Sequence, residues 1–236
     1  MTNVIDPVVD RSSRAIPDAG TGRPARRWAV PVLLQIVAMI AQAPTADREQ
    51  MLAEARDYNT RLPAGVLRDP YSGGDIDGDD ADYRAYKRSL AVAGTDVFAQ
   101  LDYPRLGIVL PVYHGTDDDV LARGVGHLYG SSLPVGGPGT HAVLTSHSGL
   151  PSASLFTPLP EAVVGDEFTI EVLGEKLSYR VDDIETVLPT QTQSLRAVAG
   201  EDRVTLVTCT PIGINSHRPA MIVRSEEHTS ELQSRQ

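Results

Sequence analysis

The sequence predicts a mainly β fold, because short apolar runs alternate with glycine and proline from residue 97 onward. Frequent short strands of this kind are typical of a closed barrel or a sandwich. A hairpin turn is indicated at Gly174-Glu175, between two such runs. The clearest expected strands are 106–113, 141–145, 167–173, 176–181 and 204–209. Helical segments are few, chiefly 83–93 and 117–122.

The composition limits the classes of function. With 236 residues and 41% hydrophobic content, the chain can form one core plus terminal appendages. A formal charge of −10 argues against a nucleic-acid surface, which needs a basic patch. One cysteine excludes an internal disulfide and indicates a free thiol or a link to another chain.

The amino-terminal 44 residues have the pattern of a targeting region. Residues 1–27 are polar and end in a basic group, so we expect a disordered cytoplasmic tail. The following run, 28–44, is mostly apolar and begins with the interfacial aromatic Trp28. Its length is at the lower limit for a membrane span. We expect a membrane anchor, with a signal peptide or a buried helix as alternatives.

Residues 45–96 are expected to form a helical strut and a stiff turn. Thr45 can cap a helix over 46–60 that docks its apolar face on the strand-rich body of the chain, although a partner-binding helix is an alternative. That face comprises Met51, Ala55, Tyr58 and Leu62. Further on, Pro70 restricts both its own backbone and Asp69, so that Asp69 and Tyr71 point in set directions. From the residues alone, an ordinary surface turn is the favoured interpretation.

An acidic run follows the turn and raises the question of calcium. Its members are Asp75, Asp77, Asp79, Asp80 and Asp82. An EF-hand loop starting at the first of them needs glycine at position 80 and glutamate at position 86, which are Asp80 and Tyr86. We therefore expect a solvated loop.

The single cysteine, Cys209, ends a β-branched run before a turn at Pro211 and Gly213. A thiol at a strand end is held by the sheet yet open to a substrate, and a nearby cation such as Arg218 favours the reactive thiolate. His147 follows another expected strand and can serve as a base for such a thiol. An inert buried cysteine and a solvated loop histidine are the alternatives. Of the other histidines, His114, His127, His141 and His217 match no compact metal motif, and we expect no metal and no cofactor.

Several motifs together resemble the sortases, the membrane-anchored cysteine transpeptidases of Gram-positive bacteria. They are TLVTC at 205–209 with Arg218 nine residues later, LPVYHGT at 110–116, GHLYGSSLPVGG at 126–137 and SHSGLPSA at 146–153. This resemblance implies an eight-stranded barrel with short helices in which Cys209 is the nucleophile, His147 the acid/base and Arg218 the oxyanion partner. Many relatives carry glycine at position 146 and arginine at 148, where this chain has serine.

The turn at Asp69, Pro70 and Tyr71 resembles the lid of class C sortases, which polymerise pilins. The resemblance implies a lid whose acid meets Arg218 and whose ring covers Cys209. It further implies that the enzyme cleaves an LPxTG-like signal and joins it to a pilin lysine, on the outer face of the membrane. A housekeeping sortase that anchors proteins to the cell wall and a non-catalytic pilus scaffold are the alternatives.

The carboxyl end departs from the family pattern. We expect the catalytic domain to span 97–223 and to be truncated there, with a last strand over 220–223. Residues 224–236 resemble the translation of a sequencing adapter, so we expect a non-native tail. A genuine hydrophilic tail is the alternative.

Overall fold

The computed structural model describes residues 44–62, 80–148, 154–187, 193–209 and 220–227. Eight strands and three α-helices lie within these ranges, joined in places by short 3₁₀ turns. The helices are α2 (Thr45–Arg61), α3 (Ala81–Arg88) and α4 (Asp118–Leu121). The strands are β1 (Val97–Tyr103), β2 (Ile108–His114), β3 (Val125–His127), β4 (Thr140–Thr145), β5 (Glu167–Val172), β6 (Glu175–Val187), β7 (Asp202–Cys209) and β8 (Ala220–Glu227). The 3₁₀ turns are η1 (Pro104–Leu106), η2 (Leu159–Glu161) and η3 (Gln193–Leu195).

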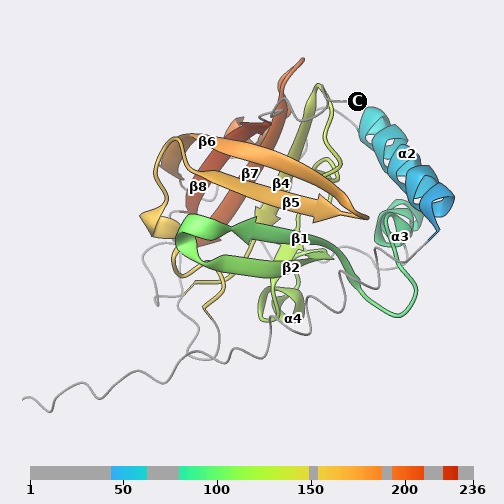
Figure 1. The fold of residues 1–236 in the computed structure, drawn as a ribbon, viewed down its shortest axis with the longest axis horizontal. Coiled ribbons are helices and arrows are strands. Elements are labelled where there is room, and N and C mark those ends of the chain that lie inside the picture. Colours follow the sequence, from blue (N-terminus) through green and yellow to red (C-terminus); the bar gives the residue numbers. More distant parts are fainter. Residues whose placement is uncertain (1–43, 63–79, 149–153, 188–192, 210–219, 228–236) are drawn as a thin grey trace, which may run out of the picture.

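The described strands close into a barrel in the order β1-β2-β3-β4-β7-β8-β6-β5, which confirms the expected eight-stranded fold. Two neighbouring pairs are parallel, β2 with β3 and β4 with β7, and the others are antiparallel. Figure 1 shows β5 and β6 crossing one side of the barrel, with β4, β7 and β8 on the other. The parallel pair β4 and β7 matters most for function, because it brings two segments more than 50 residues apart in sequence into register.

The interior of the barrel is filled by alternate side chains of its strands, as the period of two in a strand requires. Aromatic rings form a row within it: Phe168 lies 5.5 Å from Tyr103 and 5.7 Å from Tyr179, centroid to centroid. These stacked rings are almost completely buried and contribute both apolar area and ring–ring attraction. A second apolar cluster lies apart from this interior core and is described below with the site.

The first helix docks on the barrel, as the sequence predicts for a strut. Leu52 and Ala55 are buried in the main core. The amide of Asn59 forms two hydrogen bonds with the backbone of Leu133, at 3.0 Å to its carbonyl and 2.7 Å from its N–H. Figure 1 shows α2 and α3 at the same end of the barrel. Thr45 is the first residue of α2 rather than its cap, because its hydroxyl accepts from Arg48 instead of from the helix backbone.

The second helix is shorter than the expected 83–93. It starts at Ala81, where the carboxylate of Asp80 accepts from the N–H of Asp82 at 2.8 Å. One member of the acidic run is therefore a helix cap, a role that carboxylates favour at helix N-termini. The helix ends at Arg88 because Ser89 is already extended, with ψ of 132°, and Leu90 after it has a left-handed backbone with φ of 57°. Residues 75, 77 and 79 lie outside the described ranges.

The hairpin between β5 and β6 turns one residue earlier than expected. Val172 pairs with Glu175, so the two turn residues are Leu173 and Gly174. Both have positive φ, 49° and 86°, as a tight type I′ turn requires. The non-glycine residue is tolerated there because its side chain is buried in the core. β6 continues to Val187 rather than ending at 181, because it pairs with β8 along its second half.

The last strand is longer than the expected 220–223. β8 pairs with β7 from Cys209↔Ala220 to Arg203↔Glu226 and with β6 as far as Tyr179↔Glu227. Ser225 is fully buried, and its hydroxyl donates to the carbonyl of Val204 at 3.1 Å. Residues 224–227 thus belong to the barrel, although their place in a strand is no test of their origin. The non-native tail remains a prediction.

Three of the regions named from the sequence lie outside the described ranges. They are the tail 1–27, almost all of the expected anchor 28–44, and the lid turn Asp69-Pro70-Tyr71. Within the described part of the chain, no helix combines the length and apolar character needed to cross a bilayer.

Candidate active site

The parallel pairing of β4 and β7 brings His147 and Cys209 to the same end of the barrel. The ladder runs in register from Thr140↔Asp202 to Thr145↔Val207. Continuing it by two residues on each strand aligns His147 with Cys209. Because adjacent strands lie about 4.8 Å apart, the two backbones are neighbours at this register position. Extending the register in this way places the backbones of the predicted base and the predicted nucleophile at the ends of adjacent strands, two residues past the last printed pair.

The residues just before His147 and Cys209 are joined by side-chain hydrogen bonds. Thr208 donates from its hydroxyl to the carbonyl of Ser146 at 3.0 Å, and the Ser146 N–H donates to Val207 O at 3.2 Å. The hydroxyl of Ser146 in turn donates to the carbonyl of Gly124 at 2.6 Å. Ser146 and Thr208 are both fully buried. This chain of bonds ties the start of β3 to the ends of β4 and β7.

We expect Thr208→Val to lower the free energy of unfolding by about 1–3 kcal/mol, because it leaves the buried carbonyl of Ser146 without this donor. Valine keeps the shape of threonine, so the effect isolates the hydroxyl. Thr208→Ser retains the hydroxyl and is the matched control, expected to keep most of that stability. Urea unfolding of the three proteins measures the difference. Equal midpoints for the valine and serine variants would show that the bond contributes nothing.

His147 is half-buried, and its own backbone carbonyl also forms a hydrogen bond. Its carbonyl accepts from the N–H of Phe156 at 3.0 Å. The ring of Phe156 is fully buried in the main core, so this hydrogen bond ties the backbone of His147 to a core residue. These contacts set the position of the His147 backbone without involving its imidazole.

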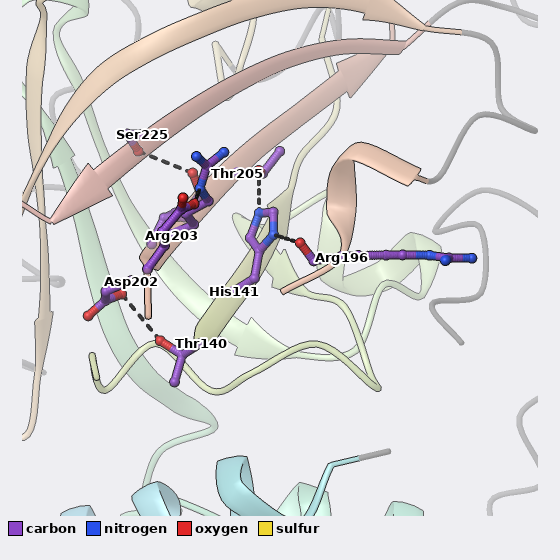
Figure 2. Close-up of polar contacts among 9 residues, drawn as sticks. Thr140, His141, Arg196, Asp202, Arg203, Thr205 and Ser225 are labelled. Carbon is purple, nitrogen blue, oxygen red and sulfur yellow. Dashed lines mark hydrogen bonds and ion pairs between the residues drawn. The ribbon is translucent and has the colours of Figure 1, made fainter. Parts of the chain in front are cut away.

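A second apolar cluster covers the outer face of β4 and β7 beside this end. It consists of Leu128, Val143, Val187, Leu195 and Val207, none of which belongs to the interior core. Leu195 comes from the connection between β6 and β7, which therefore lies over the outer face of the two strands. Figure 2 shows this connection at Arg196 approaching His141 of β4. The described part of the β6–β7 connection thus covers part of the outer face of β4 and β7.

The other described histidines, His114, His127 and His141, are buried within the fold. His127 is fully buried between Ser132, whose carbonyl lies 2.7 Å from Nε2, and the Tyr86 hydroxyl, 2.9 Å from Nδ1. Burial lowers the pKa of His127 to about 4. The pKa of His114 is lowered to about 3 by burial, with smaller contributions from His127 and Lys87. His141 bonds to Thr205 and Arg196.

No group of three or more metal-binding side chains occurs in the described ranges, and His217 lies outside them.

The structure leaves several predicted site residues untested. Arg218 and the lid residues Asp69, Pro70 and Tyr71 lie outside the described ranges, as does the side chain of Cys209. Conversely, the sequence pattern missed two groups that hold the strands around the candidate site, the carbonyl of Gly124 and the imidazole of His141. Gly124 carries no side chain that could signal its role. His141 was considered only as a metal ligand, since nothing local in the sequence shows that Arg196 and Thr205 lie beside it.

Comparison with known proteins agrees with this architecture. A family model described as the sortase domain matches residues 101–228, more than half of the chain. No curated protein matches the chain.

Among solved structures, sortase C-1 from Actinomyces oris is 41% identical with a TM-score of 0.72, covering 78% of this chain and 99% of that one. A lid mutant of sortase A from Corynebacterium diphtheriae is 37% identical with a TM-score of 0.73, covering 81% and 98%. Streptococcus pneumoniae sortase C, whose structure is described as informative on catalysis and pilin substrate specificity, is 33% identical with a TM-score of 0.75, covering 85% and 97%.

These similarities extend over nearly the full length of each solved sortase, and sortase C structures recur among them. The resemblance inferred from the motifs is thereby confirmed. The chain belongs to the sortase family of cysteine transpeptidases and is most like class C.

Proposed function

We propose that this sortase cleaves an LPxTG-like sorting signal and joins the new carboxyl end to a lysine amine of a pilin. The observation that supports the proposal is the parallel register of β4 and β7, which runs to Thr145↔Val207, two residues before His147 and Cys209. The similarity to sortase C structures, one of them described in terms of pilin substrates, supports the choice of acceptor.

The proposed reaction is acyl transfer through a thioester. The Cys209 thiolate attacks the threonine carbonyl of the signal, and the resulting oxyanion is stabilised by Arg218. Protonated His147 gives its proton to the glycine amine, which leaves as the carbon–nitrogen bond breaks. The incoming lysine amine then attacks the thioester, loses a proton to His147 and forms the new amide, which releases the thiolate. This scheme requires neither a metal ion nor an organic cofactor.

Arg218 is assigned from the motif and from its place in the chain. It precedes by two residues Ala220, the residue of β8 that pairs with Cys209. Its guanidinium is a permanent cation with a planar set of donors, which suits a developing oxyanion. Arg218→Lys keeps the charge but changes the geometry, so a large loss of rate in this variant supports an oriented contact with the oxyanion.

A lid formed by Asp69, Pro70 and Tyr71 is part of the proposal, supported by the class C resemblance and by the similarity to a sortase described as a lid mutant. We expect the double variant Asp69→Ala, Tyr71→Ala to speed alkylation of Cys209 by a small thiol reagent by about 3- to 10-fold. The factor is modest because an exposed ion pair contributes only about 0–1 kcal/mol. Alkylation is unambiguous here, since the chain has one cysteine.

The single variants Asp69→Ala and Tyr71→Ala are the controls, because they separate the effect of the carboxylate on the alkylation rate from the effect of the ring. If parent and double variant are alkylated at the same rate, the lid assignment fails. The main sequence argument for class C then fails with it.

The acceptor assay tests the function as a whole. The chain is incubated with a sorting-signal peptide and either a pilin domain or a cell-wall peptide amine, and the products are identified by mass. Joining to a pilin lysine supports the proposal, whereas joining only to the cell-wall amine indicates a housekeeping sortase. A chain that forms no thioester and no product would be a scaffold without catalysis.

The same proposal places the chain in the cell membrane through residues 28–44, with the catalytic domain outside a Gram-positive cell. Three arginines precede this apolar run, as the positive-inside rule requires for a cytoplasmic tail. Fractionation of cells that express the full chain tests this location. Recovery in the culture medium would contradict it.

A further inference from the structure

His141 is almost completely buried on β4 and bonds through both ring nitrogens. Its Nδ1 lies 3.0 Å from the carbonyl oxygen of Arg196, and its Nε2 lies 2.6 Å from the hydroxyl of Thr205 (Figure 2). A carbonyl can only accept, so Nδ1 carries the hydrogen and donates it. In the neutral ring Nε2 then accepts from the hydroxyl of Thr205. The imidazole thus joins two neighbouring strands to a third segment.

That third segment is the described part of the β6–β7 connection, residues 193–201. Most of it is exposed: Arg196 faces solvent, and Val198 keeps 42% of its surface accessible. A surface segment of this kind needs specific contacts to remain in one position. The side chain of Leu195 supplies one by packing into the outer apolar cluster, and the carbonyl of Arg196 supplies another through His141.

The anchored segment lies over the outer face of β4 and β7, the two strands that lead to the candidate active site. His141 and Val143 are alternate residues of β4 and lie on its outer face, and the same face continues along the strand toward His147. On β7, Thr205 and Val207 occupy the corresponding outer positions, four and two residues before Cys209. The segment over these residues therefore borders the region where a sorting signal must lie to reach the thiol.

We infer that His141 is a positioning residue of the transferase: it holds the 193–196 segment in place as a wall of the sorting-signal groove. The inference rests on the proposed function for the identity of the substrate. His141 does not touch the reacting atoms. It acts through the backbone of Arg196, so its loss affects how well the signal peptide binds more than how fast the bound peptide reacts.

Two amide substitutions separate the two bonds of the ring. The side-chain nitrogen of asparagine overlays Nδ1 of histidine, so His141→Asn keeps a donor for the carbonyl of Arg196. The nitrogen of glutamine overlays Nε2, so His141→Gln keeps only a group facing Thr205. His141→Ala removes both bonds. Thr205→Val removes the hydroxyl partner and leaves the bond to Arg196 intact.

The first measurement is amide hydrogen exchange of residues 193–201 in each folded variant. We expect at least a 10-fold faster exchange in His141→Ala and His141→Gln than in the parent, and near-parental exchange in His141→Asn and Thr205→Val. Trypsin cleavage after Arg196 should follow the same order. Equal exchange in the alanine variant and the parent overturns the anchoring, and so does equal exchange in the asparagine and glutamine variants.

The second measurement is the steady-state kinetics of a sorting-signal peptide, with alkylation of Cys209 as a reference. We expect KM to rise about 10-fold in the alanine and glutamine variants, with kcat and the alkylation rate within about two-fold of the parent. Fast exchange with an unchanged KM would show that the segment does not contact the signal, which overturns the positioning role. A parent protein that never processes the peptide overturns the proposed function, while the exchange experiment still decides whether His141 anchors the segment.

Discussion

Replacing Cys209 by alanine should lower sorting-peptide cleavage by at least about 10⁴-fold and eliminate the thioester adduct. The size of the effect follows from covalent catalysis: without the thiol the acyl group has no attachment point, and the chain has no second cysteine to replace it. Alanine pairs with β8 through its backbone as Cys209 does with Ala220, so the barrel should be preserved. Peptide cleavage and intact-protein mass after incubation with peptide measure the two losses.

The matched controls are His147→Ala and the double variant with Cys209→Ala. If the pair acts as a unit, each single variant loses most of the activity, and the double variant loses little more than the worse of the two. A circular dichroism spectrum and a melting curve identical to the parent's exclude loss of fold. Cleavage that persists in purified Cys209→Ala protein contradicts the proposed nucleophile.

Local patterns predicted the barrel because its strands are short and β-branched and end at glycine or proline. The run from Val204 to Thr208 is a clear case: it is apolar or β-branched throughout, and it forms most of β7. The strand limits were less predictable, since β6 and β8 are extended by pairing with each other rather than by their own composition. Polar residues such as Ser225 lie in β8 because the barrel supplies partners for them.

The candidate site rests on a different kind of evidence. Cys209 and His147 stand in motifs, so a resemblance could name them before any geometry was known. What a motif does not contain is the contact between distant segments: Thr208 with Ser146, and His141 with Arg196. The first contact depends on the parallel register of β4 and β7, and the second on how the β6–β7 connection lies over β4, and no local pattern encodes either. The residues that position the site were therefore found only in the structure.

Lowering the pH from 7 to 5 should destabilise this protein by about 4 kcal/mol through His114 and His127 alone. Both imidazoles are held neutral in the fold: burial lowers the pKa of His127 to about 4 and that of His114 to about 3. In the unfolded chain both titrate near the ordinary value of about 6.5. Between these values the unfolded state binds protons that the folded state does not, so stability falls as the pH falls. The loss begins near pH 6.5 and levels off near the folded pKa values.

The structural cause is the packing around Tyr86. Its hydroxyl lies 2.9 Å from Nδ1 of His127 and also accepts from the N–H of Gly115 at 2.9 Å. The ring of His114 lies 4.9 Å from that of Tyr86 and 4.2 Å from that of Phe98, centroid to centroid. A proton added to either imidazole would therefore place a positive charge among aromatic rings. None of the contacts just described supplies a carboxylate to compensate that charge.

Urea unfolding at pH 7 and pH 5 measures the loss, and His114→Phe provides the control. Phenylalanine suits a site between two aromatic rings and removes one titrating group, so the variant should lose only about 2 kcal/mol over the same interval. The window above pH 5 keeps most carboxylates ionised, so their protonation adds little. A parent protein that is as stable at pH 5 as at pH 7 would show that the two histidines are not buried in the neutral form.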